Sequence, residues 1–523
     1  MLKVGRVLIL GPALFIFCAA ACRKAPPAIV PDNTAIVDEV RLEGFDVLPA
    51  DVREDLAEEL PLRAGKRLTD DAEKAAGERA VEILQNHGRP YAQVGIAREP
   101  IDPARTRVIV RAQPGPIGVF GPVDITGNRR VDDRIIRRRL AYVPGDLFRR
   151  SAIELTQQRI GSLGLFKSVE IRAHEIDNQP AVVPTLVTVE EGTPWKWNLG
   201  LGYAAGERLG VDARISHLNV FGAAGRVDLQ GRVSRIEQTF ETAYTQADTW
   251  HPALSFGLQG RHQAIDESAF FVLSRGGEAS ASWQWTRAFA STFSYAVALE
   301  RSDVDAALDP LLGLEDGMLN AWAADLVHRR FARAQAPLSV LSLHVEQAGR
   351  WMPGTFNYFT IDGDARHYRS AFDNRVVFAT RLHMASSDPA GGEEDLPLLK
   401  RFFLGGLNEM RAWGVYELSP LSASGEPVGG KSLLSGIAEL RVPVFNRVRG
   451  TIFVEAGNVW QDSWAVRLDD LRYDIGSGVR LETPFGLLRL DFGYQLTPID
   501  GLRIDGQPQT SRWRFNFGIG EAF

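Results

Sequence analysis

The feature that most constrains this chain is a period-two alternation of apolar and polar residues across its last 329 residues, from Trp195 to Phe523. Alternation with this period is typical of β-strands that turn one face towards an apolar environment. After residue 21, no segment contains 18 consecutive apolar residues. If the chain lives in a membrane, it must therefore cross it with strands that close into a barrel, because lipid offers no partner for unpaired backbone groups.

The positions of the tryptophans favour such a barrel over a soluble sandwich, which would also alternate. Seven of them fall near the ends of proposed strands, as aromatic girdles do: Trp195, Trp197, Trp250, Trp283, Trp285, Trp460 and Trp513. The segment has room for about 16 strands of roughly 10 residues with their connections. An even strand number lets the ends pair antiparallel, and closure removes edges that would aggregate.

The N-terminus resembles an export signal. Lys3 and Arg6 precede 15 apolar residues, which as a helix would span about 22 Å and fall short of a bilayer core of about 30 Å. We interpret residues 1–21 as a signal peptide with a small-residue cleavage site and residues 22–34 as a flexible linker. Cys22 directly follows this site, so it is a candidate for lipidation; an ordinary mature terminus is the alternative.

Residues 35–192 repeat one element order, β-α-α-β-β, with a period near 80 residues. The pattern Val40-x-Leu42-x-Gly44 recurs 83 positions later as Val123-x-Ile125-x-Gly127. A period of this length indicates two copies of one small domain. We therefore divide the chain into domains at 35–114 and 115–192, followed by a barrel at 193–523.

The second copy carries segments that resemble a POTRA domain, and the first copy matches more loosely. These segments are Ile125-Thr126-Gly127-Asn128, Pro144-Gly145-Asp146 and Leu163-Gly164-Leu165-Phe166. POTRA domains are periplasmic modules that handle unfolded chains by adding a strand to their sheet edge. Any other small α+β binding domain is the alternative.

One barrel segment resembles loop six of the BamA/TamA outer-membrane assembly family. It runs from Arg401 to Gly414 and contains Gly405, Gly406, Arg411 and Trp413. The family usually has V-R-G-[FY] where this chain has Met410-Arg411-Ala412-Trp413. The arginine is kept, but a positive φ at Ala412 would cost more than at glycine.

A second segment, Ile452 to Asn458, resembles the family's F-x-D-x-G strand, with Glu455 in place of the commoner aspartate. Alternation points Phe453, Glu455 and Gly457 into the lumen. In the family, the loop arginine pairs with this acid, so the resemblance implies an Arg411–Glu455 ion pair. A bidentate contact would hold loop six inside the barrel; two unrelated lumen charges in water are the alternative.

The end of the chain carries two further family features. Thr483-Pro484-Phe485-Gly486 resembles a T-P-x-G turn before the penultimate strand. The last strand ends on an aromatic residue and resembles the signal by which outer-membrane barrels are recognised; its residues are Trp513, Phe515, Phe517, Gly518, Ile519 and Phe523. Gly518 weakens this strand.

Composition and motifs exclude several functions. A net charge of −6 does not fit a polybasic nucleic-acid binder. The two cysteines, Cys18 and Cys22, leave the rest of the chain without a disulfide framework or a cysteine metal site. Gly425 to Ser432 formally match a phosphate-binding loop, but that motif requires a helix after it and a strand is expected here. We expect no enzyme activity, metal, cofactor or nucleic-acid partner.

The expected fold is therefore a pair of α+β POTRA repeats followed by an all-β, 16-stranded antiparallel transmembrane barrel in the outer membrane. The resemblance implies a protein that inserts, assembles or exports other proteins there, with outer-membrane lipid and unfolded clients as partners and a TamB-like periplasmic protein as an optional one. The seam between the first strand (195–203) and the last (512–523) would be the weak closure. The alternatives are a two-partner secretion transporter and a passive porin or surface antigen.

Overall fold

The computed structural model describes residues 35–519, apart from 103, 174–179, 205–206, 248–249, 268–269, 305–315, 332–336, 373–374, 393–394, 484–485 and 505. The proposed signal peptide (1–21), the linker with Cys22 (22–34), the middle of the T-P-x-G turn and Phe523 lie outside these residues. The chain divides into two compact units. One comprises Met1–Pro122, Pro144–Ser151 and His174–Pro184, and the other comprises Val123–Val143, Ala152–Ala173 and Thr185–Phe523.

The first repeat has the predicted order of elements: β1 (Ile36–Glu43), α1 (Ala50–Glu59), α2 (Asp70–Asn86), β2 (Gln93–Pro100) and β3 (Arg105–Gln113). The Thr69 hydroxyl accepts a hydrogen bond from the Ala72 amide at 3.2 Å and caps α2. The three strands lie in the order β1-β3-β2, with β1 parallel and β2 antiparallel to β3. β2 is therefore an edge strand.

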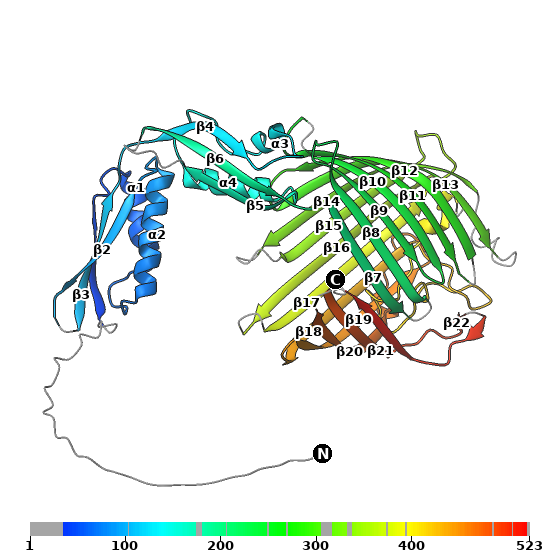
Figure 1. The fold of residues 1–523 in the computed structure, drawn as a ribbon. Coiled ribbons are helices and arrows are strands. Elements are labelled where there is room, and N and C mark those ends of the chain that lie inside the picture. Colours follow the sequence, from blue (N-terminus) through cyan, green and yellow to red (C-terminus); the bar gives the residue numbers. More distant parts are fainter. Residues whose placement is uncertain are drawn as a thin grey trace, which may run out of the picture. The chain divides into compact units, whose positions relative to one another are not determined.

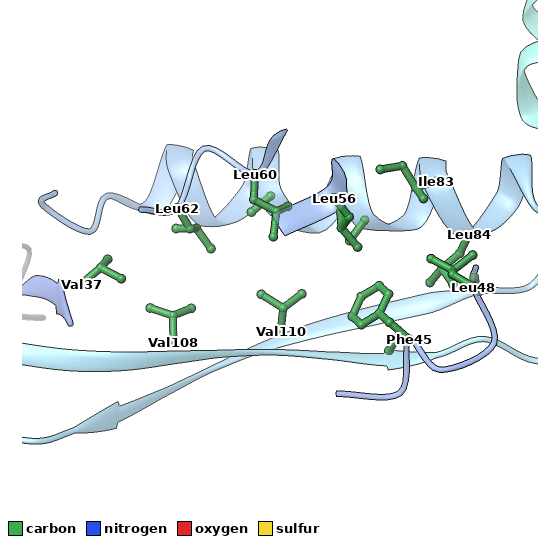
Figure 2. Close-up of a cluster of buried hydrophobic side chains, with 14 of the residues drawn as sticks. Val37, Phe45, Leu48, Leu56, Leu60, Leu62, Ile83, Leu84, Val108 and Val110 are labelled. Atoms are coloured by element: carbon green, nitrogen blue, oxygen red, sulfur yellow. The ribbon is translucent and has the colours of Figure 1, made fainter. Parts of the chain in front are cut away.

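The core of the first repeat lies between its helices and its sheet (Figure 2). Leu56 of α1 and Leu84 of α2 are fully buried against the sheet residues Val108 and Val110, which are also fully buried. Alternating residues of β3 thus supply one apolar face, and the helices cover it.

The second repeat contains β4 (Val119–Thr126), α3 (Asp133–Arg137), α4 (Arg150–Gly161), β5 (Phe166–Ala173) and β6 (Val182–Glu191), with strand order β4-β6-β5. The first of its helices ends at Arg137. The amides of Arg139 and Leu140 bond to carbonyls three residues back, so the chain leaves the helix through a tight turn.

Glu191 at the end of β6 fixes the turn that precedes α3. Its Oε1 accepts hydrogen bonds from the amides of Arg129, Arg130 and Val131 at 2.7, 2.7 and 3.0 Å, and its Oε2 accepts one from Arg130 Nε at 2.9 Å. Burial opposes ionisation of this carboxyl, but the Arg130 guanidinium and the three amides outweigh it and lower its pKa from 4.5 to about 2. Glu191 is therefore ionised at neutral pH.

The remaining strands close into a barrel of sixteen antiparallel strands, as predicted (Figure 1). They are β7 (Trp195–Ala204), β8 (Arg208–Val220), β9 (Gly225–Val233), β10 (Glu237–Ala247), β11 (Leu254–Asp266), β12 (Phe270–Gln284), β13 (Phe289–Val304), β14 (Gly317–Phe331), β15 (Pro337–Ala348), β16 (Tyr358–Ala371), β17 (Val376–Pro389), β18 (Ser432–Phe445), β19 (Val448–Trp460), β20 (Arg472–Thr483), β21 (Gly486–Gln495) and β24 (Trp513–Ile519). The short strands β22 (Arg503–Ile504) and β23 (Gln507–Pro508) form a separate hairpin. None of the described helices is long and apolar enough to cross a membrane.

The outer wall of the barrel is apolar, as the alternation predicts. Ile452 and Val454 of β19 are 60% and 48% exposed, whereas Phe453 and Glu455 between them are buried. Most of the predicted girdle tryptophans are exposed, but Trp460 is 4% exposed and is not part of a girdle. The segment that returns from loop six bonds to its backbone: the Lys431 amide donates to the Trp460 carbonyl at 2.8 Å.

Candidate functional site

The candidate site is the long segment between β17 and β18, residues 390–431, called loop six below, together with the lumen wall that it contacts. The loop folds back on itself through isolated bridges between Phe402 and Gly430 and between Leu404 and Leu418. Gly405 has a φ of +117°, and a Cβ there would lie 2.0 Å from the Gly414 carbonyl oxygen. This position therefore requires glycine.

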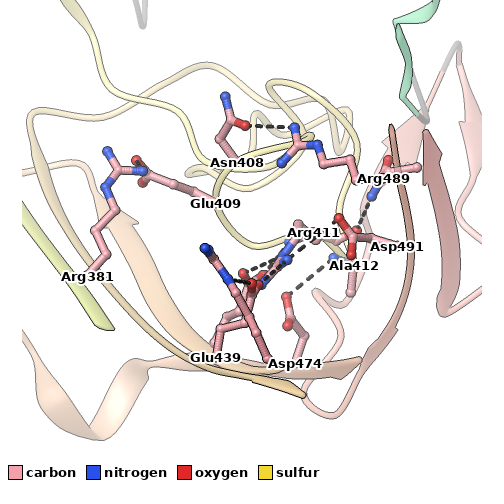
Figure 3. Close-up of polar contacts among 12 residues, drawn as sticks. Arg381, Asn408, Glu409, Arg411, Ala412, Glu439, Asp474, Arg489 and Asp491 are labelled. Carbon is pink, nitrogen blue, oxygen red and sulfur yellow. Dashed lines mark hydrogen bonds and ion pairs between the residues drawn. The ribbon is translucent and has the colours of Figure 1, made fainter. Parts of the chain in front are cut away.

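Arg411 lies at the centre of the site and is completely buried (Figure 3). Its Nε donates to Glu455 Oε1 at 2.8 Å, and its Nη1 donates to Glu439 Oε2 at 2.8 Å. The guanidinium carbon lies 3.5 Å from the centre of the Phe453 ring, a close cation–π contact. Burial alone would lower the pKa of Arg411, but Glu455, Glu439 and Asp491 raise it above its ordinary value, so the cation persists.

The structure thus brings Arg411 and Glu455 together, in a geometry that differs from the expected one. Only one guanidinium nitrogen bonds to Glu455, and the second carboxylate oxygen accepts the Arg411 backbone amide at 2.5 Å. The side chain and the main chain of one residue therefore hold Glu455. This arrangement frees Nη1 for Glu439 and fixes the loop backbone itself.

Sequence reasoning did not find most of the charged residues around Arg411. Glu439 also accepts from Arg441 Nε at 2.7 Å, and Asp491 accepts from Arg480 Nη1 at 2.7 Å. All of these side chains come from inward-facing positions of β18, β20 and β21. The sequence signal that could have found them is the alternation within each strand, which assigns these charged residues to the inward face.

The loop residues beside Arg411 pack tightly against the wall. Ala412 has a negative φ, so alanine has no backbone cost at this position. The residue with left-handed backbone is Met410, on the other side of Arg411, with a φ of 51°. The wall leaves room for the loop by using glycine. A Cβ on Gly493 would lie 3.0 Å from Ala412 Cα, and one on Gly457 would lie 3.2 Å from Leu404 Cδ1.

Trp413 and Gly406 complete the predicted loop-six motif. Trp413 is fully buried in an apolar cluster with Leu404, Leu418 and Leu433. Gly406 has a φ of +102°, and its amide donates to the Trp413 carbonyl at 2.9 Å. The motif therefore forms a compact turn with an apolar side and a charged side.

A second anchor holds loop six on the other side of Arg411. Glu409 forms an ion pair with Arg381 and accepts from His383 Nδ1 at 3.1 Å, both on β17. Asn408 Oδ1 accepts from Arg489 Nη2 of β21 at 2.9 Å. Loop six is thus fastened to β17 and to β21, four strands apart along the barrel wall (Figure 3).

Within the described residues, which end at Ile519, the ladder between the last and first strands is short. β24 pairs with β21 over seven residue pairs, from Leu488↔Ile519 to Tyr494↔Trp513, whereas its described pairing with β7 is Phe517↔Tyr203. In the described part of the barrel, this junction has the fewest residue pairs between neighbouring strands. The other β24 residues of the terminal motif, Trp513, Phe515 and Ile519, face outwards and are exposed, whereas Gly518 faces the lumen.

Loop six contacts this weakly paired strand directly. Asn516 Nδ2 donates to the Arg411 carbonyl at 2.8 Å, and Arg514 Nη2 forms an ion pair with Glu417 Oε2 at 3.1 Å. Leu407 of the loop lies close to both strands of the seam. A Cβ added to Gly202 of β7 would be 3.5 Å from Leu407 Cδ1, and a Cβ added to Gly518 of β24 would be 3.7 Å from Leu407 Cδ2. The contacts of loop six therefore add to the closure that the backbone ladder lacks.

The formal phosphate-loop match lies in the segment that leaves loop six. Gly425 and Gly429 have positive φ values, and β18 begins at Ser432. A strand stands where the phosphate-binding loop needs a helix N-terminus. The segment therefore lacks the structural setting of that motif.

Comparisons with known proteins agree with this geometry. The Omp85 superfamily domain matches residues 338–523, and the surface antigen variable number repeat, a POTRA family, matches residues 118–192. The outer membrane protein assembly factor BamA of Neorickettsia risticii is 22% identical over 467 residues, covering 86% of this chain and 62% of that protein. BamA of Nitratidesulfovibrio vulgaris is 22% identical over 416 residues, covering 75% of this chain and 50% of that protein.

Residues 338–523 belong to the Omp85 superfamily, and residues 118–192 are a POTRA repeat. The fold of the chain is similar to that of Haemophilus ducreyi BamA lacking POTRA domains 1–3, with a TM-score of 0.73 at 16% identity over 92% of this chain and 99% of that one. CdiB from Acinetobacter baumannii matches less well, with a TM-score of 0.54 at 12% identity over 93% of this chain and 89% of that one.

The matched domains give the location of the chain. The barrel lies in the outer membrane, and the POTRA domains lie in the periplasm. This chain spans between 50% and 62% of the length of the curated BamA relatives that it matches.

Proposed function

We propose that this chain inserts, assembles or exports other proteins at the outer membrane, receiving them on its POTRA domains and passing them to the barrel seam. The observation that carries the proposal is that one residue pair joins β24 to β7 among the residues that the structure describes. Two strands that are barely paired expose backbone donors and acceptors, and a client strand can satisfy them by pairing in their place. The lumen network holds the rest of the barrel rigid while the seam exchanges partners.

The first repeat offers a receiving surface at its sheet edge. A groove of about 460 Å³ lies between α2 and β2, with Val81, Val94 and Ile96 supplying apolar contact and Glu73 and Lys74 at its side. β2 is the edge strand of this sheet. An extended client segment could add to β2 and place alternate apolar side chains in the groove.

The proposed work needs neither a covalent step nor a nucleotide. The client supplies the free energy, because pairing its backbone and burying its apolar face in lipid are both favourable. We therefore propose that the chain is not an enzyme.

Loop six argues against the passive porin. Met410, Arg411, Ala412 and Trp413 are fully buried inside the barrel, so the loop fills part of the lumen that a porin leaves open to water. The two-partner secretion transporter remains the second candidate because of the weaker likeness to CdiB. The family resemblance extends the proposal to a TamB-like periplasmic partner, which co-purification with the full chain would test.

A disulfide across the seam tests the gate directly. Tyr203 and Phe517 are cross-strand partners, so cysteines at these positions fall within the range that a disulfide bridges. The matched control keeps Phe517→Cys and combines it with Leu490→Cys, because Leu490 is the partner of Phe517 on β21. Oxidation of the first pair should abolish assembly and oxidation of the control should not; full activity with a locked seam would exclude the gate.

Assembly itself is measured in liposomes with a urea-unfolded barrel client, scored by the heat-modifiable gel mobility of the folded product. The chain should speed client folding, and deletion of residues 35–192 should remove the gain. If the client folds no faster than in empty liposomes, the chain is not an assembly factor. Secretion of a dedicated partner would then be the function to test.

A further inference from the structure

The barrel carries a basic pair on its outer, lipid-facing wall that the proposed assembly function does not use. Arg275 of β12 and His262 of β11 are direct cross-strand partners, and Arg275 Nε donates to His262 Nδ1 at 3.1 Å. Both lie in the same outward row as Phe240 of β10 and Leu299 of β13, which are 53% and 61% exposed. The pair therefore points away from the lumen.

None of the same-face neighbours of this pair is acidic, and the diagonal neighbour Arg301, the partner of Leu273, adds a second exposed cation. Phe240 and Leu299 flank it across the strands. Along the strands, its same-face neighbours are Gly260, Ala264, Leu273 and Gly277. Arg275 itself is exposed. A guanidinium on a lipid-facing wall without an acidic neighbour is unfavourable in hydrocarbon unless an anion accompanies it.

The depth of the pair agrees with the level of lipid headgroups. Trp283 lies on the same face of β12, eight residues away at the periplasmic end, where it stacks with His251 and lies beside Trp285. Eight residues span about 27 Å along a strand, or about 21 Å across a membrane at a tilt near 40°. The apolar band of such barrels is about 25 Å tall, so Arg275 lies near its outer boundary.

A hollow in the outer wall adjoins the pair on its membrane side. Its volume is about 800 Å³, and its lining includes small residues, Ala213, Gly231 and Gly260, beside the apolar Ile215, Leu229 and Phe240. A Cβ on Gly260 would meet no atom within 4 Å, so the glycine widens the hollow instead of relieving a clash. The hollow has the size of sites that bind small molecules and the polarity of an acyl chain.

We propose that this wall is a binding site for a membrane lipid with an anionic phosphate headgroup. The acyl chain lies in the hollow, and the phosphate binds the terminal nitrogens of Arg275. Arg275 Nε donates to His262, so the two terminal nitrogens, Nη1 and Nη2, can form a bidentate contact with the phosphate. His262, accepting at Nδ1, presents its Nε2–H as a further donor.

The test places a photoreactive benzoylphenylalanine at Leu229 in the full chain, reconstituted in phosphatidylcholine vesicles containing one-tenth phosphatidylglycerol. After irradiation, mass spectrometry counts the two lipid adducts on the labelled peptide. The phosphatidylglycerol adduct should exceed its bulk share by about fivefold, the factor that one arginine contributes at an anionic surface. Arg275→Gln should return the ratio to the bulk value, and Arg275→Lys should keep part of the enrichment.

The control places the same probe at Leu343 of β15, whose cross-strand neighbours Leu326 and Gly363 are uncharged. This probe should report the bulk ratio in every variant. Heat-modifiable gel mobility confirms that each variant is folded before irradiation. A bulk ratio at Leu229 in the otherwise unchanged chain, or an enrichment that survives Arg275→Gln, would overturn the proposal.

Discussion

Replacing Arg411 with methionine tests whether the lumen network holds loop six in place. Methionine keeps much of the side-chain length but removes the cation. The variant loses the Nε bond to Glu455 and the Nη1 bond to Glu439, while the backbone amide bond to Glu455 remains. Glu439 also keeps its bond from Arg441. Glu455 is therefore the carboxylate whose side-chain cation is lost.

The expected cost follows from these contacts. Two hydrogen bonds to charged groups contribute about 3–6 kcal/mol together, and the arginine that still serves Glu439 reduces the loss. Breaking a buried ion pair by removing one partner costs about 3–5 kcal/mol. We expect Arg411→Met to lower the free energy of unfolding by about 3 kcal/mol, which is more than a hundredfold in the equilibrium constant.

The assay is urea unfolding of the protein in lipid vesicles, followed by tryptophan fluorescence. Arg449→Met is the matched control, because the Arg449 side chain on β19 is 40% exposed and forms an ion pair with the exposed Glu482; it should cost below about 1 kcal/mol. A double-mutant cycle with Glu455→Gln should give a coupling energy of about 2 kcal/mol. Equal costs for the two arginine variants, or zero coupling, would refute the reasoning.

Three further substitutions test other parts of the structure. Gly405→Ala should cost about 2 kcal/mol or more in the same urea assay, because φ is +117° there; an unchanged midpoint would contradict the assigned backbone. Glu191→Gln should cost about 2 kcal/mol at pH 7. Folding lowers the pKa of Glu191 to about 2, so the wild type has this extra stability above pH 4.5 and loses it as the pH falls towards 2. The melting temperatures of the two proteins should therefore converge near pH 2. A difference in melting temperature that stays constant with pH would exclude an ionised Glu191 as the source of the stability. Asn516→Leu removes the bond to the Arg411 carbonyl and should speed amide exchange in β24 about fivefold, with β19 as the unaffected reference; equal rates in β24 would show that loop six does not hold that strand.

The sequence predicted the barrel because each strand carries its own evidence. Period-two alternation fixes which face of a strand meets lipid, and this correctly placed Phe453 and Glu455 in the lumen and Ile452 outside. The resemblance of the loop-six segment then singled out Arg411.

The carboxylates that surround Arg411 could not be predicted from the pattern of any single strand. Glu439 faces Phe453 across the ladder, and Asp491 lies two strands away from Glu455, so the convergence of these carboxylates on one arginine depends on the register between strands. Register is set by the assembled sheet and not by the local pattern. Trp460 was misassigned for the same reason, since the segment that bonds to its backbone returns from loop six.

The distribution of contacts around β24 bears on how such a barrel could open and still remain folded. A complete ladder would tie β24 to β7 with hydrogen bonds along its whole length, and all of them would have to break together. In the described part of the seam, one residue pair and a few side-chain contacts from loop six provide the closure. Each such bond contributes about 0.5–1.5 kcal/mol net, so opening the seam costs a few kcal/mol. Because Arg411 binds Glu455 through both its side chain and its amide, loop six stays in place when β24 leaves, and the same contacts can reclose the barrel.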